Sequence, residues 1–173
     1  MSDYKKYSIV MVGGAAAKMA LSILDEKKDE LAGRYSKRYL ENAEKCLNGE
    51  MVSFEDIKDI TGITDFPDTM VCPCGDKGVF GALWDLGELL KTGLKVNLSD
   101  IPIDQAAIEL CDHADINPYE SDSTGAYLIA AVFPGEILGK LKENGAACNV
   151  IGYTTKENAR IITGPSERYL TKP

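Results

Sequence analysis

The sequence is poor in the residues that several functional classes require. It has one histidine and one tryptophan, and its 19 lysine and arginine residues are outnumbered by 27 aspartate and glutamate residues. The resulting net charge of −8 argues against binding to nucleic-acid phosphates, which relies on clustered cations. No apolar run approaches the roughly 18 residues of a membrane span. We therefore expect neither a nucleic acid nor a membrane as a partner.

The cysteines are too few and too scattered for a disulfide framework. Their number is odd, and they stand at positions 46, 72, 74, 111 and 148. Secreted disulfide frameworks usually contain an even and denser set of cysteines. The first residues also lead directly into a strand-like segment, without the apolar core of a signal peptide. These features favour a reducing, cytoplasmic location.

What the chain does contain is typical of a globular protein. Of its 173 residues, 45% are hydrophobic and 27% are charged. A chain of this length buries roughly two thirds of its unfolded surface, which is enough for one stable core. No internal repeat or low-complexity linker divides it. We predict a single domain over residues 1–173.

Short apolar runs alternate with amphipathic segments along the chain. The apolar runs predict strands at 7–12, 69–72, 94–98, 126–133, 149–153 and 160–163. The amphipathic segments predict helices at 15–24, 36–47, 79–90, 104–114 and 134–144, with a short one after the Ser53 capping box. Asn48-Gly49 is expected to end the second helix, and residues 73–77 to form a turn. This alternation indicates an α+β fold, a mixed β-sheet covered by helices.

Three blocks in a fixed order resemble a known family. They are Gly78–Glu88, which begins Gly-Val-Phe-Gly-Ala-Leu-Trp; Ile101–Asp104, followed by Asp115–Pro118; and Ser123–Ala130, followed by Val150–Gly152. Together they resemble the C-terminal domain of aminoimidazole ribonucleotide synthetase and its relatives. They are most similar to the hydrogenase-maturation carbamoyl-dehydratase branch of that family. The resemblance covers about residues 70–155 and implies the mixed sheet of that domain.

The resemblance fails at two places. Family members carry an Asp-x-Thr-x-Gly-Gly loop ahead of the Gly-Ala-Leu-Trp helix, where this sequence has Pro73, Gly75 and Lys77 instead of Asp, Thr and one glycine. In the family, a separate N-terminal domain holds ATP and its metal ions, and this sequence leaves no room for it and has no Walker-type motif. We therefore expect a domain without the ATP-binding half, predict no cofactor and expect no catalysis by the isolated chain.

Cys72 and Cys74 flank Pro73 in the most distinctive motif of the sequence. A turn that presents two thiols at a helix N-terminus, next to Lys77, can lower a thiol pKa, form a redox pair or bind a soft metal ion. A Cys-x-Cys pair supplies two ligands where a zinc site normally uses four, so no metal site is predicted. A structural role in the turn is the favoured alternative, with the redox and metal roles behind it.

Two glycine turns and a pair of hydroxyls are candidate ligand-binding groups. Gly13-Gly14 between a strand and a helix suits either an anion nest or a tight turn, and the turn before the Gly78 helix offers a helix N-terminus. The hydroxyls have no adjacent base that would activate a nucleophile. The candidate residues are Gly13, Gly14, Lys18, Gly75, Asp76, Lys77, Gly78, Ser123 and Thr124. The single histidine, His113, is expected on the surface near a helix end, where it interacts with the helix dipole.

Three functions are compatible with these residues. The first is a non-catalytic binding domain for a small anionic ligand or a protein partner, with homodimer formation. The second is a subunit of a split ATP-dependent enzyme, whose ATP-binding half is a separate chain. The third is a thiol-based accessory protein in metalloenzyme maturation, acting through Cys72 and Cys74 with a maturation partner. We rank the first slightly above the second and the third well behind.

Overall fold

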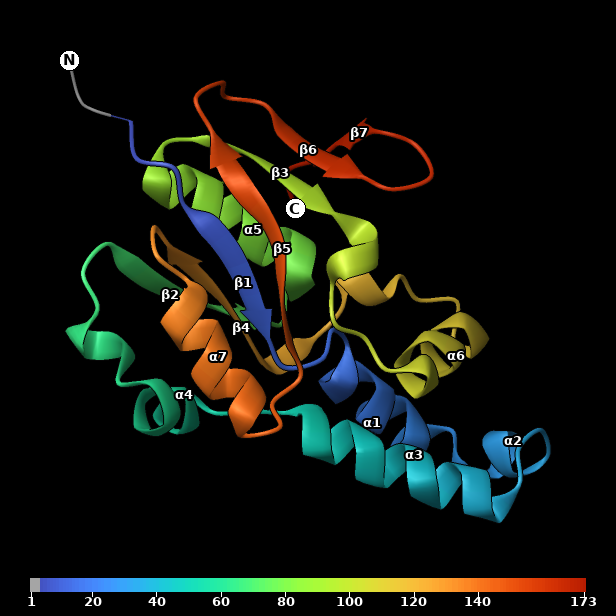
Figure 1. Ribbon diagram of the computed structural model, residues 1–173. Helices are drawn as coiled ribbons and strands as arrows, with labels where there is room; N and C mark the ends of the chain where they lie inside the picture. The colour runs from blue at the N-terminus through green and yellow to red at the C-terminus, as the bar shows by residue number, and fades with distance from the viewer. Residues whose placement is uncertain (1–3) are drawn as a thin grey trace.

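The computed structural model describes residues 4–173, which form a seven-stranded sheet with helices on both faces (Figure 1). The strand order is β2-β4-β1-β5-β3-β6-β7. The strands are β1 (Ser8–Val12), β2 (Thr69–Gly75), β3 (Gly93–Asn97), β4 (Ser123–Ala131), β5 (Cys148–Thr155), β6 (Arg160–Thr163) and β7 (Arg168–Tyr169). The α-helices are α1 (Ala17–Glu26), α2 (Lys28–Ala32), α3 (Lys37–Glu50), α4 (Phe54–Thr61), α5 (Gly78–Leu90), α6 (Gln105–His113) and α7 (Gly135–Glu143).

The sheet is mixed. Its middle strand, β1, pairs antiparallel with β4 on one side and with β5 on the other. Towards one edge, β3 and β6 pair in parallel, and β7 closes that edge antiparallel to β6. The predicted α+β fold, a mixed sheet covered by helices, is confirmed.

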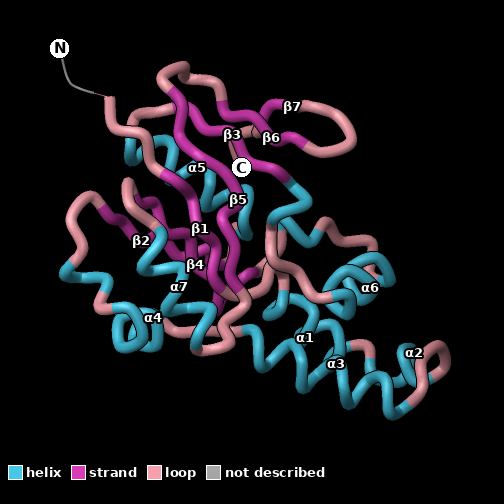
Figure 2. The backbone as a smooth tube through the Cα atoms, in the orientation of Figure 1, coloured by secondary structure: helices cyan, strands magenta, loops and turns pink. Residues whose placement is uncertain are grey.

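The two faces of the sheet are buried under different helices, as Figures 1 and 2 show. Side chains alternate between the faces along a strand, so β1 contributes to both cores. Ile9 and Met11 join the core under α5, whereas Val10 and Val12 join the core under α4 and α7. All four side chains are fully buried. This double burial explains why the β1 segment is apolar without alternation.

A third core lies among helices beyond one end of the sheet. There α1, α2, α3 and α6 pack together, and Figure 1 shows α2 at the far tip of this group. The buried residues include Ala20, Leu31, Leu47 and Leu110. The chain enters this group directly from β1 through Gly13 and Gly14, so the start of α1 lies at the end of the sheet.

The sequence predictions were wrong at several local points; strand β4, for example, already begins at Ser123, where the sequence favoured a turn before a strand at 126–133. Residues 73–75 continue strand β2 rather than form a turn, because β2 is an edge strand and an edge tolerates the missing N–H of Pro73. Helix α3 runs through Asn48-Gly49 to Glu50, three residues beyond the predicted end at residue 47. The short helix α2 was not predicted at all.

Candidate functional site

The candidate ligand-binding residues meet at one end of the sheet, where β1 and β2 end and β4 begins. Gly75 pairs with Ser123 across β2 and β4. A β-carbon on Gly13 would lie 2.5 Å from the Gly125 carbonyl oxygen, and one on Gly78 would lie 2.6 Å from the Ser121 carbonyl oxygen. We call residues 13–18, 75–78 and 121–125 the sheet-end surface. The candidate residues that the sequence identified separately within these three segments are brought to one end of the sheet by the fold.

The Gly13-Gly14 turn is not an open anion nest, which corrects the anion-binding alternative for this turn. Its backbone N–H groups already donate within the chain: Gly13 to the Ala147 carbonyl at 2.8 Å, and Gly14 to that of Glu50 at 3.4 Å. The next N–H group, of Ala15, donates to Pro102 at 2.8 Å. The positive φ of 88° at Gly13 serves a tight strand-to-helix turn instead. Lys18 lies exposed in the first turn of α1 beyond it.

Ser123 and Thr124 have different surroundings despite being neighbours. The Ser123 side chain is fully buried, and its hydroxyl accepts a hydrogen bond from the Ala16 N–H at 2.8 Å while donating to the Ser121 carbonyl at 3.1 Å. This hydroxyl therefore holds the start of α1 and is not offered to a ligand. Thr124 is exposed, and its hydroxyl donates to the Asp122 carboxylate at 2.6 Å. Of the two hydroxyls, that of Thr124 is the one a ligand can reach.

In the turn before α5, Asp76 and Lys77 are exposed, whereas Gly78 at the start of the helix is buried. Gly75 and Gly78 both have positive φ, 60° and 76°, and Gly78 also lets the backbone approach Ser121 closely. The first turn of α5 has no side-chain cap. Helices α1, α2 and α7 also lack a side-chain cap, whereas α3, α4 and α6 are capped by the side chains of a serine or an aspartate. The uncapped N–H groups of α5 are the strongest anion-binding feature here.

Charges around this turn are nearly balanced. Asp76 and Lys77 are both exposed at the turn. The Lys77 side chain runs back over Gly81, where a β-carbon would lie 2.4 Å from that of Lys77, and its Nζ lies 3.7 Å from a carboxylate oxygen of Asp85. Lys77 is thus partly neutralised by Asp85. The sequence suggested a free positive charge beside the thiols, but Lys77 is paired with Asp85.

Cys72 and Cys74 lie in strand β2 rather than in a turn. Being two residues apart, they point to the same face, towards the core under α5. Burial, and then the Asp85 carboxylate, raises the pKa of the Cys72 thiol. Burial, and then Cys72, raises the pKa of Cys74 to about 12. The thiols are therefore less acidic than usual, which opposes the alternative in which the helix N-terminus and Lys77 lower a thiol pKa.

A titratable group that the sequence did not reveal lies next to Gly14. A β-carbon on Gly14 would lie 2.0 Å from Oε2 of Glu50, so the Glu50 side chain packs directly over this glycine. That oxygen is buried and has no hydrogen-bond partner in the described part of the chain. Burial, and then the Asp104 carboxylate, raises the pKa of Glu50 to about 7. The position at the end of α3 gave no sequence signal, because Asp104 is more than fifty residues away.

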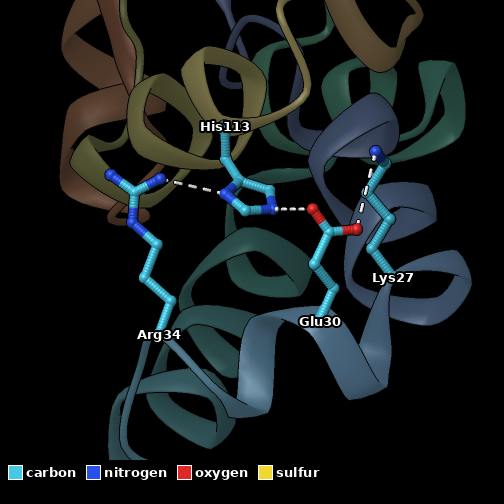
Figure 3. A network of polar contacts seen from close by, with 4 residues as sticks. All are labelled: Lys27, Glu30, Arg34 and His113. Atoms are coloured by element: carbon cyan, nitrogen blue, oxygen red, sulfur yellow. Dashed lines mark hydrogen bonds and ion pairs between the residues drawn. The ribbon is translucent and has the colours of Figure 1, made fainter.

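His113 lies in a polar network with Glu30 and Arg34 (Figure 3). Its Nδ1 is 3.0 Å from Nη1 of Arg34, and its Nε2 is 2.9 Å from Oε1 of Glu30. Because a guanidinium can only donate, Nδ1 accepts and Nε2 carries the proton. The His113 side chain is 10% exposed, which corrects the expected surface position. The histidine joins α2 to α6 and is remote from the predicted ligand site.

Comparisons with protein-family models and with curated protein sequences find no match. Solved structures do match. A crystal structure of E. coli HypE has a TM-score of 0.76 and 14% identity, covering 99% of this chain and 51% of that chain. ThiL complexed with AMPPCP and TMP has a TM-score of 0.61 and 15% identity, covering 98% and 51%. T. maritima PurL complexed with AMPPCP has a TM-score of 0.52 and 15% identity, covering 98% and 25%.

These superpositions decide the fold. It is that of the C-terminal domain of aminoimidazole ribonucleotide synthetase-like proteins. The predicted resemblance is confirmed at this level, and the chain spans about half the length of the HypE structures that it matches. Within residues 4–173, no three His, Cys, Asp or Glu side chains gather as metal ligands. None of the helices formed by these residues has the length and apolar character needed to cross a bilayer.

Proposed function

We propose that this chain is a HypE-like binding domain, not catalytic by itself, that takes a small anionic ligand at the sheet-end surface. The observation that carries the proposal is the uncapped first turn of α5, held there by Gly75 and Gly78. The N–H groups of a helix N-terminus bind phosphate and carboxylate groups readily.

The non-catalytic part of the proposal has its own support. The buried hydroxyl of Ser123 holds α1, and His113 is engaged between Arg34 and Glu30. The raised pKa values of the Cys72 and Cys74 thiols oppose nucleophilic attack at neutral pH, because the thiolate is the reactive form. The Ser123 hydroxyl and the His113 imidazole therefore have structural roles. The same raised pKa values argue against the thiol-based accessory function, because that function needs a reactive thiolate.

Titration with inorganic phosphate and with ATP tests the ligand site. We expect a saturable thermal shift and backbone amide shifts in NMR spectra that concentrate at residues 75–80. Thr124→Glu, which adds a negative charge to the exposed part of the same surface, should weaken binding about five- to tenfold. Thr124→Gln is the matched neutral control and should bind like the parent. If neither ligand binds, or if the two variants bind equally, the proposed site is wrong.

A second candidate is a subunit whose site is completed by another polypeptide. It is favoured by the span of the match, which covers 99% of this chain but about half of each HypE chain. One matching structure is a HypE–HypF complex, so a protein of this fold does assemble with a different chain. Tagged chain purified from its native cells should then repeatedly recover one ATP-binding or maturation partner. Recovery of this chain alone would count against the second candidate but not against the first.

We also propose a homodimer in a cytoplasmic, reducing location. The dimer would use a helix or sheet face, and light scattering of the purified chain measures its mass directly. A mass equal to that of one chain over the micromolar concentration range would refute it. Free thiols at all five cysteines in the described structure agree with a reducing location.

A further inference from the structure

A cavity of about 530 Å³ lies at the opposite end of α5 from the sheet-end surface. Its walls are formed by the last turns of α5, by the connection between β5 and β6, and by β7. The side chains that matter are Trp84, Lys91, Asn158, Arg160 and Tyr169. The volume is within the range of about 300–1,000 Å³ typical of small-molecule sites. The proposed function makes no use of it.

Arg160 is held rigidly in the wall of this cavity. Its guanidinium lies over the Trp84 ring, 4.2 Å from the centroid, and its Nη2 donates to Oε1 of Glu88 at 2.8 Å. A β-carbon on Gly87 would lie 2.4 Å from Nε of Arg160, so the glycine makes room for this arrangement. The side chain is 11% exposed. A guanidinium fixed in this way loses little further freedom when it binds a ligand.

The cavity has more positive than negative charge to offer. Nε of Arg160 is closed off from solvent, which leaves the terminal guanidinium nitrogens as its available donors. Lys91 is exposed and forms no ion pair with the described residues. Together with Glu88, the two cations give the lining a net charge of +1. This local excess stands out in a chain whose net charge is −8.

Two aromatic rings flank these charges. Trp84 is half-buried under Arg160, whereas Tyr169 on β7 is 74% exposed although it lines the cavity. An exposed aromatic ring at a concave surface is suited to cover a flat ring by stacking. A cation at one side of such a site then selects for a negatively charged substituent on that ring.

We propose that this cavity binds a flat aromatic molecule that carries a carboxylate. The ring lies against Tyr169, and the carboxylate accepts hydrogen bonds from Lys91 and from the terminal nitrogens of Arg160. Asn158, exposed at the rim, supplies a side-chain amide for a further polar group. The site is separate from the sheet-end surface, so it stands or falls independently of the proposed function.

Trp84 makes the test direct, because it is the only tryptophan in the chain and gives one indole N–H signal in an NMR spectrum. Benzoate should shift this signal saturably, with a dissociation constant of about 1–10 mM, as expected for a ligand of nine heavy atoms. Acetate lacks the ring and benzamide lacks the charge, so each should bind about tenfold more weakly. Equal shifts from benzoate and acetate, or from benzoate and benzamide, would overturn the proposal.

Two exposed side chains allow variants that keep the fold. Tyr169→Ala and Lys91→Gln should each weaken benzoate binding about three- to tenfold while leaving the melting temperature nearly unchanged. Lys142→Gln on α7 is the matched control, an exposed lysine distant from the cavity, and should bind benzoate like the parent. Unchanged benzoate binding in both Tyr169→Ala and Lys91→Gln would overturn the assignment, as would the absence of any benzoate-induced shift of the Trp84 signal.

Discussion

The hydroxyl of Ser123 accepts a hydrogen bond from the Ala16 N–H at 2.8 Å, joining the start of β4 to the start of α1 across more than a hundred residues. Replacing Ser123 with Ala leaves a buried N–H group without an acceptor. We expect the free energy of unfolding to fall by about 1–3 kcal/mol, measured by urea titration. Thr124→Ala is the neighbouring control and should change it by no more than about 0.5 kcal/mol, because Thr124 is exposed. A loss of similar size in both variants would contradict this role of Ser123.

Glu50 should make the stability depend on pH. Its pKa is raised from 4.5 to about 7 in the folded protein, so the folded state holds this proton more tightly than the unfolded state. The free energy of unfolding should therefore decrease as the pH rises from about 4.5 through 7. Glu50→Gln cannot lose the proton, so it should gain stability relative to the parent at pH 8 more than at pH 5.

Glu44→Gln is the control for this prediction, because Glu44 is exposed on the same helix. The free energy of unfolding of the parent, Glu50→Gln and Glu44→Gln is measured by urea titration at pH 5 and pH 8. If Glu50→Gln differs from the parent by the same amount at both pH values, the carboxyl of Glu50 does not titrate as the structure indicates.

His113 should control how firmly α2 is held. Its ring makes polar contacts with Glu30 in α2 and with Arg34 just after it, and this helix has only five residues (Figure 3). His113→Ala removes both contacts, so trypsin should cleave after Lys28 or Arg34 several-fold faster. The sheet core should keep its protection in hydrogen exchange. Asp112→Ala is an exposed control on the same helix, and equal cleavage rates in the two variants would exclude this role.

The cysteines should react with thiol reagents in order of exposure. Cys46 is exposed, whereas Cys74 is buried and has a pKa raised to about 12. At pH 8, 5,5′-dithiobis(2-nitrobenzoic acid) should label Cys46 quickly. Cys74 should react at least about a hundredfold more slowly than Cys46, because its thiol becomes accessible only when the protein unfolds. The single variant Cys46→Ser should remove the fast phase. A fast phase that survives and requires Cys72 or Cys74 would revive the thiol-based function.

The sequence predicted helices and strands well wherever apolar residues recur at the regular spacing of a helix or a strand. The strand Arg160–Thr163 was predicted with its observed bounds, and α5 starts one residue before the first predicted position, because local apolar spacing determines both. The capping box at Ser53 was also confirmed, since its two partners are three residues apart. Strand β2 was predicted too short because nothing local marks it as an edge strand, where Pro73 is tolerated.

The candidate site was only partly predictable. Gly13 and Gly14 have the sequence of an anion nest, but their N–H groups are satisfied by carbonyls of Ala147 and Glu50, which no local pattern could assign. The cavity beside Arg160 was missed for the same reason. It depends on Trp84 and Tyr169, which are 85 positions apart and meet only when β6 and β7 extend the sheet beside α5.

Pro73 also affects how copies of this chain can meet. An edge strand ordinarily offers a row of N–H groups to which a strand of another molecule can add, the first step towards ordered aggregates. In β2 the proline leaves one donor out of that row, and its ring is exposed there. A strand added along β2 would forgo a hydrogen bond and meet the proline ring. This edge is thus protected against intermolecular sheet growth.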